Sequence, residues 1–512
     1  MLADVTTFAV LGLEPRRVCV EVDLHAGLPS FTIVGLGDRA VREARERVRA
    51  AIQNSGLTFP DKRVTVSLAP ADLRKVGPGY DLAIACGVLA ASGQVPTEPL
   101  GRLAVFGELA LSGQLRPGRG VLAVAEGAAQ TGLDGLVVCG ARAREAELVG
   151  GLAVHAADSL LDVVAILRGE EPGAAAGGVD LESDAEGEGR RPAEVVDLAD
   201  VRGHASTLEA LTLAAAGGHN LLLCGPPGTG KTMLARRLPG ILPPLSAAEA
   251  LEVTRIQSVV GVRDVDGLAA RRPFRAPHHS VSASGLVGGG SVPTPGEATL
   301  AHHGVLFLDE LAEFSRLALD ALRQPLEDGR VAVVRGQRTA IYPTRFMLVA
   351  ATNPCPCGHA GTDRCSCTEV DLARYRRKLS GPLLDRIDLT CVVGRPTAED
   401  LAAPAHRDTA TERARVLEAR DRQRWRLRET SATCNAHMDA GLVARFVRLD
   451  ASGERHLRRV YERGGLSARG HGRVLRLART VADLAHSDDV RGPHVLRALA
   501  LRQDDGLEEL TA

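Results

Sequence analysis

Gly225-Pro226-Pro227-Gly228-Thr229-Gly230-Lys231-Thr232 is the stretch that decides the fold of this 512-residue chain. Two glycines with four residues between them, followed by Lys and Thr, form the phosphate-loop pattern. Asn220–Cys224 (NLLLC) before the loop predicts a short buried strand, and Thr232–Leu238 (TMLARRL) after it predicts a helix. An ordinary Gly/Pro turn before a core helix is the alternative, but here the motif, the strand and the helix agree.

The chemistry of a phosphate loop needs these residue types. Glycines let backbone N–H groups turn inward around phosphate oxygens, and the helix N-terminus adds positive potential. We expect Lys231 to reach the β- and γ-phosphates and the Thr232 hydroxyl to ligate Mg²⁺. The predicted nucleotide-binding set is Gly225, Pro226, Pro227, Gly228, Thr229, Gly230, Lys231, Thr232, Met233 and Asp309.

Val305–Glu310 (VLFLDE) is an apolar run that ends in two acids. Such a run is typical of a central parallel strand that is buried on both faces. Acids at its carboxyl end would emerge beside the phosphate loop, where open α/β sheets bind their ligands. We expect Asp309 to hold the Mg²⁺ shell and Glu310 to polarise the attacking water. Two exposed acids that cap the next helix are the alternative.

A third predicted strand, Arg345–Ala351 (RFMLVAA), ends in Thr352-Asn353. A polar residue at this place can orient water through the γ-phosphate, and Asn353 fits that role. Thr352 stays an alternative, because the sequence does not separate the two.

Composition and length limit the possible functions. Apolar residues make up 45% of the chain, which suffices for about three packed domains. A net charge of −1 argues against bulk electrostatic binding of DNA, although a local basic surface stays possible. The N-terminus carries no signal-peptide pattern, and no stretch approaches a membrane span. We therefore expect a soluble, cytoplasmic protein whose ten cysteines are free or metal-bound.

Shifts in composition divide the chain into four parts. Residues 1–168 mix short strands and helices, and residues 169–192 are rich in Gly, Ala and Glu and read as a flexible acidic linker. Residues 193–396 alternate strands and helices as a doubly wound α/β sheet would. Residues 397–512 are helical and rich in arginine.

The order of these motifs, with Leu383–Asp388 (LLDRID) after them, resembles that of an AAA+ ATPase. More narrowly, the chain resembles the ComM/YifB family, the bacterial magnesium chelatase-like ATPases, over nearly its full length. The most specific segments are residues 272–280 (RPFRAPHHS), 295–304 (PGEATLAHHG) and 380–386 (SGPLLDR). The resemblance implies an AAA+ core with a magnesium chelatase-type insert, an N-terminal domain like that of Lon protease, and a C-terminal helical lid.

The resemblance also assigns roles to single residues. Lys231 and Thr232 match the Walker A motif, Asp309 and Glu310 match Walker B, and Asn353 matches sensor 1. Two further roles fall to arginines: Arg386 resembles the arginine finger and Arg469 the sensor 2 arginine, with Arg473 as a rival one helical turn further on. The implied catalytic set is Lys231, Glu310, Asn353, Arg386 and Arg469.

An arginine finger completes the site of a neighbouring subunit, so the resemblance implies a homo-hexameric ring. A surface ion pair with Asp385 or Asp388 is the alternative for Arg386.

The Lon-like domain raises the hypothesis of a protease, which needs a Ser nucleophile and a Lys base. Gly77–Asp81 (GPGYD) occupies the region of the Ser motif without a serine, and Leu122 stands about where the Lys would be. We therefore expect this domain to be catalytically inactive and to serve structure or to bind an unknown protein partner.

Arg330–Val334 and Thr339–Tyr342 alternate like the strands of a hairpin, with Arg335-Gly336-Gln337-Arg338 as its turn. In related rings such a hairpin points into the central pore, where Arg335 and Arg338 would contact the phosphates of a threaded DNA strand. A solvated turn is the alternative.

Two Cys-x-Cys pairs, Cys355/Cys357 and Cys365/Cys367, offer four thiolates for a structural Zn²⁺. His359 and Asp363 are spare ligands, and a reduced, metal-free loop is the alternative. His278 and His279 are assigned to the insert rather than to a metal, because adjacent residues of a loop rarely converge on one ion.

The helix predicted over Arg413–Arg428 is strongly basic and holds Trp425, the only Trp of the chain. Trp425 could stack on a base, but we favour packing of this side chain between the lid and the core.

Members of the ComM/YifB family act as helicases that promote branch migration during natural transformation. The resemblance therefore implies an ATPase that moves on single-stranded or branched DNA. The alternative is a protein-remodelling motor, like the ATPase subunit of magnesium chelatase.

Overall fold

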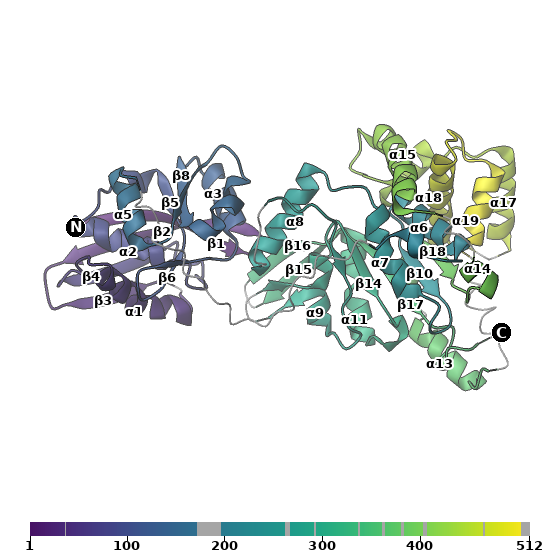
Figure 1. Cartoon of the computed structure of the whole chain (residues 1–512), viewed down its shortest axis with the longest axis horizontal. Coiled ribbons are helices and arrows are strands. Elements are labelled where there is room, and N and C mark those ends of the chain that lie inside the picture. The colour runs from purple at the N-terminus through teal and green to yellow at the C-terminus, as the bar shows by residue number, and fades with distance from the viewer. Residues whose placement is uncertain are drawn as a thin grey trace. The chain divides into compact units, whose positions relative to one another are not determined.

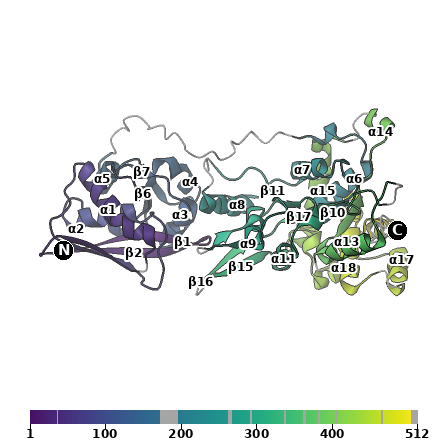
Figure 2. The same ribbon diagram turned by 90° about the horizontal axis from the view of Figure 1, so that it is seen from below.

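The computed structural model describes residues 1–35, 37–171, 196–261, 267–290, 293–335, 338–360, 364–379, 383–402, 407–463 and 466–502. The chain forms two compact units (Figures 1 and 2). The first comprises Met1–Glu188 and Ala247–Ala269, and the second comprises Gly189–Ser246 and Ala270–Ala512. The predicted linker lies outside the described residues from residue 172 onward.

The first unit is built on a seven-stranded mixed sheet in the order β3-β4-β2-β1-β5-β8-β9. Its long strands β1 and β2 pair antiparallel from Leu2↔Asp23 to Leu11↔Glu14, and alternate residues of β2 are buried, as one covered face requires. The strands are β1 (Leu2–Leu11), β2 (Glu14–His25), β3 (Ser30–Val34), β4 (Arg63–Ala69), β5 (Leu103–Val105), β8 (Gly135–Cys139) and β9 (Ala153–Ala157). A separate small hairpin joins β6 (Glu108–Leu109) to β7 (Leu115–Arg116).

Four α-helices lie between these strands in sequence, and a fifth follows β9. Every residue of α2 is buried, so this helix forms the centre of the core. In α1, Val41, Ala44, Val48 and Ile52 are buried on one face, as their helical spacing predicts. The helices are α1 (Arg39–Asn54), α2 (Asp81–Ala91), α3 (Val121–Gln130), α4 (Ala143–Glu147) and α5 (Leu160–Arg168).

The Phe106 ring fills the space beside Gly79, in the segment that corresponds to the Ser motif of Lon-type proteases. A Cβ atom at Gly79 would lie 2.7 Å from the Phe106 ring, and a Cβ atom at Gly118 would lie 2.8 Å from the same ring. Leu122 is fully buried. A serine at position 79 would therefore require Phe106 to move.

Helix α8 (Ala247–Val260) follows the phosphate-loop helix in sequence but packs in the first unit. Arg255 pairs with Glu126 at 2.6 Å, and the Gly120 N–H donates to the Ser258 carbonyl at 3.0 Å. The Ser258 hydroxyl donates to buried Glu145. The structure groups residues 247–269 with the first unit, whereas the sequence predicts one nucleotide domain over residues 193–396.

The second unit holds a parallel five-stranded sheet in the order β11-β14-β17-β10-β18, which confirms the predicted doubly wound α/β core. The two strands beside β10 pair with it in register, Leu221↔Val349 and Leu221↔Leu389. The strands are β10 (Leu221–Cys224), β11 (Phe274–Arg275), β14 (Val305–Leu308), β17 (Met347–Thr352) and β18 (Leu389–Val392).

Helices and small hairpins complete this core. The helices are α6 (Ala205–Gly217), α7 (Lys231–Ile241), α9 (Ala283–Val287), α10 (Glu297–Leu300), α11 (Arg316–Ala321), α12 (Arg323–Asp328) and α13 (Glu369–Leu379). Strands β12 (Gly288–Gly289) and β13 (Thr294–Pro295) pair antiparallel, as do β15 (Arg330–Arg335) and β16 (Arg338–Pro343). The second pair is the hairpin expected from the sequence.

The described residues after 397 are helical, as predicted, and pack on the core through α6. Thr212 of α6 donates to buried Glu412 at 2.6 Å, and Gln423 donates to the Ala216 carbonyl at 2.9 Å. The helices are α14 (Ala398–Ala402), α15 (Thr409–Leu427), α16 (Ala440–Phe446), α17 (Ala451–Glu462), α18 (Ala468–Leu484) and α19 (Gly492–Ala500). Across the described ranges, no helix combines the length and apolar character needed to cross a lipid bilayer.

Glu145→Leu should destabilise the first unit by about 3 kcal/mol, because it removes a buried acceptor from several donors at once. Glu145 accepts from the Leu122 N–H at 3.1 Å, from Arg142 at 3.0 Å and from Ser258. Thermal unfolding of the full chain measures the effect. Glu147→Leu on the exposed side of α4 is the matched control. Equal midpoints for the two variants would contradict this account.

Candidate nucleotide site

The phosphate loop joins the carboxyl end of β10 to α7, as predicted. Gly228 and Gly230 have φ angles of +78° and +83°, which favour glycine. A Cβ atom at Gly225 would lie 2.2 Å from the Val393 carbonyl oxygen, so this position admits no side chain. The glycines of the motif are therefore required by backbone geometry.

Lys231 lies inside the loop with 9% of its surface exposed. Its Nζ donates to the carbonyls of Gly225 at 2.6 Å and Pro226 at 2.8 Å, and to Asn353 Oδ1 at 3.2 Å. Burial lowers the pKa of this ammonium group, and the nearby Cys224, Asp309 and Glu310 oppose that shift. The ammonium can exchange these oxygens for those of a phosphate.

Thr232 and Asp309 meet although 77 residues separate them. The Thr232 hydroxyl, in the first turn of α7, donates to Asp309 Oδ2 at 2.6 Å at the end of β14. A hydroxyl and a carboxylate at one point are oxygen ligands of the kind that Mg²⁺ prefers. These two residues fit the predicted magnesium site.

Glu310 follows Asp309 in a left-handed backbone conformation, with φ of +52°. This conformation is strained for a residue with a side chain and is typical of functional sites. The Glu310 side chain is 58% exposed, and its Oε2 lies 3.3 Å from His279 Nδ1. The structure thus brings His279 to the expected catalytic base. This contact cannot be predicted from the sequence, because His279 and Glu310 lie 31 positions apart and share no motif.

Asn353 and Thr352 point in different directions. The Asn353 side chain meets Lys231, whereas the Thr352 hydroxyl is buried and lies 3.0 Å from the Tyr375 hydroxyl. Tyr375 donates to the Asn353 carbonyl at 2.9 Å, and burial raises the pKa of Tyr375 to about 12. The geometry therefore favours Asn353 as the polar group at the phosphates, with Tyr375 as a supporting residue that the sequence did not reveal.

Arg386 lies at the other end of the sheet. Asn220 immediately precedes β10, and its side-chain amide donates to the Arg386 carbonyl at 2.9 Å. The Arg386 guanidinium pairs with Glu327 of α12. At about 3.3 Å per residue, β10 places the phosphate loop about 15 Å from this point.

Arg469 and Arg473 belong to the same end as Arg386. A cavity of about 510 Å³ is lined there by five arginines, Arg345, Arg386, Arg469, Arg473 and Arg476. Arg473 Nε lies 3.7 Å from buried Asp388, while Arg469 is exposed. Burial acts to raise the pKa of Asp388, but the hydrogen bond from His219 and the nearby arginines hold it below its usual value.

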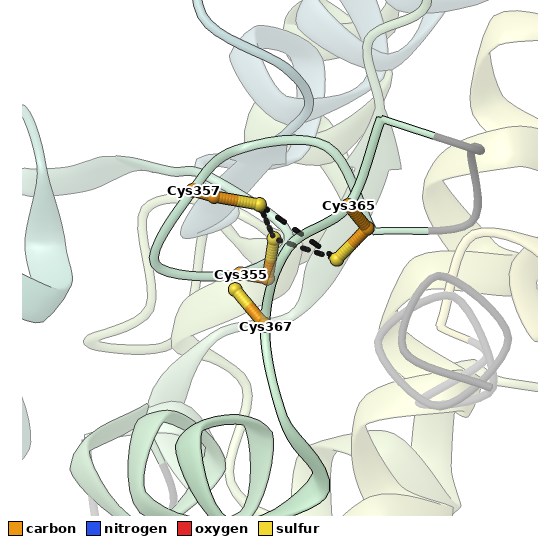
Figure 3. A group of neighbouring side chains, drawn as sticks. All are labelled: Cys355, Cys357, Cys365 and Cys367. Atoms are coloured by element: carbon orange, nitrogen blue, oxygen red, sulfur yellow. Dashed lines mark hydrogen bonds between the residues drawn. The ribbon is translucent and has the colours of Figure 1, made fainter.

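The structure also gathers the four predicted zinc ligands. The sulfur atoms of Cys355, Cys357, Cys365 and Cys367 all lie within 4.8 Å of one another (Figure 3). We refer to these residues as the cysteine cluster. Asp363, one spare ligand, lies outside the described residues, and the cluster as described consists of thiols alone.

Of the two candidate DNA contacts, the hairpin tip and Trp425, the structure describes only Trp425. The tip of the β15–β16 hairpin, with the side chains of Arg335 and Arg338, lies outside the described residues. Trp425 does not pack between lid and core as we favoured: it is 72% exposed, with the Arg428 guanidinium 4.8 Å from its ring. We expected burial because a large apolar ring is usually shielded from water. The sequence does not show which face of α15 packs on α6, and Trp425 lies on another face.

Comparison with known proteins agrees with this architecture. Family models match residues 197–401 (Magnesium chelatase, subunit ChlI), 20–141 (Subunit ChlI of Mg-chelatase) and 406–502 (Magnesium chelatase, subunit ChlI C-terminal). The chain is 43% identical to YifB of Salmonella typhimurium over 99% of its own length and 98% of that protein. It is 42% identical to competence protein ComM of Haemophilus influenzae over 98% of its length and 97% of that protein.

The chain belongs to the ComM/YifB family of magnesium chelatase-like AAA+ ATPases. It is also 27% identical to Lon protease 2 of Bacillus subtilis, over 33% of this chain and 35% of that protein. Membership of this family implies an ATPase that uses ATP with Mg²⁺, in agreement with the oxygen ligands at Thr232 and Asp309.

Lys231→Ala and Glu310→Gln should fail at different steps. Loss of a charged donor should weaken ATP binding by about 10- to 100-fold in Lys231→Ala. Glu310→Gln should bind ATP normally but hydrolyse it about 10²- to 10⁴-fold more slowly, because it lacks the general base. Binding of a fluorescent ATP analogue and release of phosphate measure the two steps.

Lys378→Ala and Glu313→Gln, both at exposed positions, are the matched controls. A parental hydrolysis rate in Glu310→Gln would disprove its assignment as the base.

Proposed function

We propose that this chain forms a ring and that its ATP hydrolysis drives movement along DNA. The proposal of a ring rests on the position of Arg386. This residue lies at the amino end of the sheet, about 15 Å from the phosphate loop of its own chain. An arginine at that distance cannot contact a phosphate bound in its own loop. As an arginine finger it would serve a nucleotide held by another copy. Head-to-tail contacts form a ring where the rotation closes, and the resemblance to AAA+ ATPases implies a hexamer.

Each residue of the site has a separate task in hydrolysis. Lys231 holds the β- and γ-phosphates, and Glu310 accepts a proton from the attacking water. Asn353 orients that water, and the neighbour's Arg386 neutralises charge that develops on the transferred phosphoryl group. Mg²⁺, held by Thr232 and Asp309, neutralises phosphate charge when bound. His279 fixes one oxygen of the Glu310 carboxylate and leaves the other to accept the proton.

Arg469 and Arg473 add cationic groups beside Arg386. Because they line the same cavity at the amino end of the sheet, we assign them to the neighbour's nucleotide as well. Arg469 is the better candidate for direct contact with that nucleotide, because it is exposed whereas Arg473 forms an ion pair with Asp388.

Three observations support DNA as the track. A relative that aligns over nearly its full length is named a competence protein. The β15–β16 hairpin carries arginines at both sides of its turn. The lid has a cavity of about 780 Å³ lined by Trp425 with five arginines and four acids, namely Arg422, Arg426, Arg428, Arg445, Arg448, Asp421, Glu429, Asp488 and Asp489. An exposed Trp among arginines suits a single strand, whose bases stack and whose phosphates pair with guanidinium groups.

A protein-remodelling motor is the second candidate. It is favoured by the family models, which carry the name of a magnesium chelatase subunit, and by the packing of α8 in the first unit. In that case the first unit would bind the protein that the motor acts on.

Mixing two inactive variants tests the ring. Arg386→Ala keeps an intact phosphate loop, Lys231→Ala keeps an intact finger, and each alone should lose about 10³-fold in hydrolysis. In mixed rings the first variant supplies the loop and the second the finger, so an equimolar mixture should recover up to about a quarter of the parental rate. Arg395→Ala, an exposed arginine nine residues further along the chain, is the control. A mixture no faster than its components would contradict a finger in trans.

DNA should both quench the fluorescence of Trp425 and accelerate ATP hydrolysis. Trp425 is the only Trp, so the emission of the full chain reports this one site. Titration with single-stranded and branched oligonucleotides at low and moderate salt measures binding, which should weaken as salt rises. Release of phosphate under the same conditions measures the coupling.

The double variant Arg335→Ala/Arg338→Ala should lose the acceleration by DNA, because the hairpin no longer grips the strand. Arg316→Ala/Arg374→Ala removes two exposed arginines from elsewhere in the same unit and serves as the control. A parental hydrolysis rate that no DNA changes would favour the protein-remodelling motor instead.

A further inference from the structure

The cysteine cluster has the dimensions of a tetrahedral metal site. Four sulfur atoms bound at about 2.3 Å to one Zn²⁺ lie about 3.8 Å apart. The measured distances between Sγ atoms are 3.3 Å for Cys355–Cys357, 3.9 Å for Cys355–Cys365 and 3.7 Å for Cys357–Cys365. All four thiols are free, and Figure 3 shows their side chains converging on one point. This set of soft ligands without a carboxylate selects Zn²⁺ over Mg²⁺ or Ca²⁺.

Backbone N–H groups point at two of the sulfur atoms. The Ala360 N–H donates to Cys355 Sγ at 3.1 Å, and the N–H groups of His359 and Ser366 donate to Cys357. Such donors spread the negative charge that four thiolates bring to one divalent cation. Binding of the metal would release the thiol protons to solvent.

The apolar cluster formed by the described residues of the loop is small. Its apolar core consists of Cys355, Ala360 and Leu372, with the other three cysteines packed against them. A cluster of this size buries too little apolar surface to order a loop, and small folds of this kind depend on metals or other cross-links.

The cluster adjoins the nucleotide site on two sides. Cys355 comes two residues after Asn353, and Cys367 comes two residues before α13, whose Tyr375 donates to the Asn353 carbonyl. A Cβ atom at Gly358, inside the loop, would lie 2.6 Å from the ring of Pro227 in the phosphate loop. The loop is therefore packed directly on the phosphate loop and connects Asn353 to α13.

We propose that the cysteine cluster binds one Zn²⁺, and that this ion holds Asn353 and the phosphate loop in the geometry needed for hydrolysis. The cluster connects the end of β17 to the start of α13. Loss of the ion would therefore release the loop next to Asn353 and also the helix whose Tyr375 donates to the Asn353 carbonyl. The ion has four protein ligands and no open position, so its role is structural. The inference rests on the proposed ATP site but not on movement along DNA.

Metal content and coordination test the site without reference to activity. The purified full chain should contain about one Zn²⁺ per chain by elemental analysis, and X-ray absorption should show four sulfur neighbours at about 2.3 Å. Cys357→Ser/Cys365→Ser should lose the ion, while Cys139→Ala, a buried cysteine of the first unit, should keep it. Protein without zinc that also takes up none when refolded with it, or iron at one per chain in its place, would overturn the assignment.

Hydrolysis tests the positioning role. The double variant should hydrolyse ATP about 100-fold more slowly than the Cys139→Ala control, because a displacement of about 1 Å in a catalytic group has that effect. Chelation of the metal from the folded parental protein should slow hydrolysis equally, which covers the case of a variant that fails to fold. Loss of the ion with a parental rate would overturn the positioning role while leaving the ATPase itself intact.

Discussion

The parallel pairing of β10 with β17 and β18 is the constraint on which the second unit depends. The register Cys224↔Thr352 and Cys224↔Val392 brings three strand ends to one level. The Gly225 N–H then donates to the Thr352 carbonyl at 3.2 Å, and Lys231 reaches Asn353 across 122 residues of sequence. A shift of one residue in this register would separate the phosphate loop from the polar group that faces it, because neighbouring side chains of a strand point to opposite faces.

The two ends of these strands carry different groups. The carboxyl ends carry Lys231 and Glu310, whereas the amino ends carry Arg386 and the arginine-lined cavity. In the proposed ring, the amino end of this sheet in one copy would meet the carboxyl end in the next copy. Hydrolysis would then depend on the contact between neighbours, and each subunit could sense the nucleotide of the next.

The sequence predicted what short motifs encode and missed what only tertiary contacts create. The strand, loop and helix around Lys231, the strand before Asp309 and the β15–β16 hairpin could be predicted because glycine geometry and apolar periodicity are local properties. The contact between His279 and Glu310 could not, since nothing in the sequence aligns two residues from separate loops. Trp425 was misjudged for the same reason: the periodicity of α15 is dominated by arginine and does not mark which face is covered.

Helix α8 shows how the nucleotide site can influence the rest of the chain. Five residues, 242–246, separate the end of α7 from the start of α8, which packs in the first unit through Arg255 and Ser258. The chain then returns to β11, at the edge of the nucleotide-binding sheet. Residues 247–269 of the first unit therefore lie in the path of the chain from the phosphate-loop helix to the sheet. We infer that a movement of α7 during hydrolysis would reach the first unit through this short covalent connection.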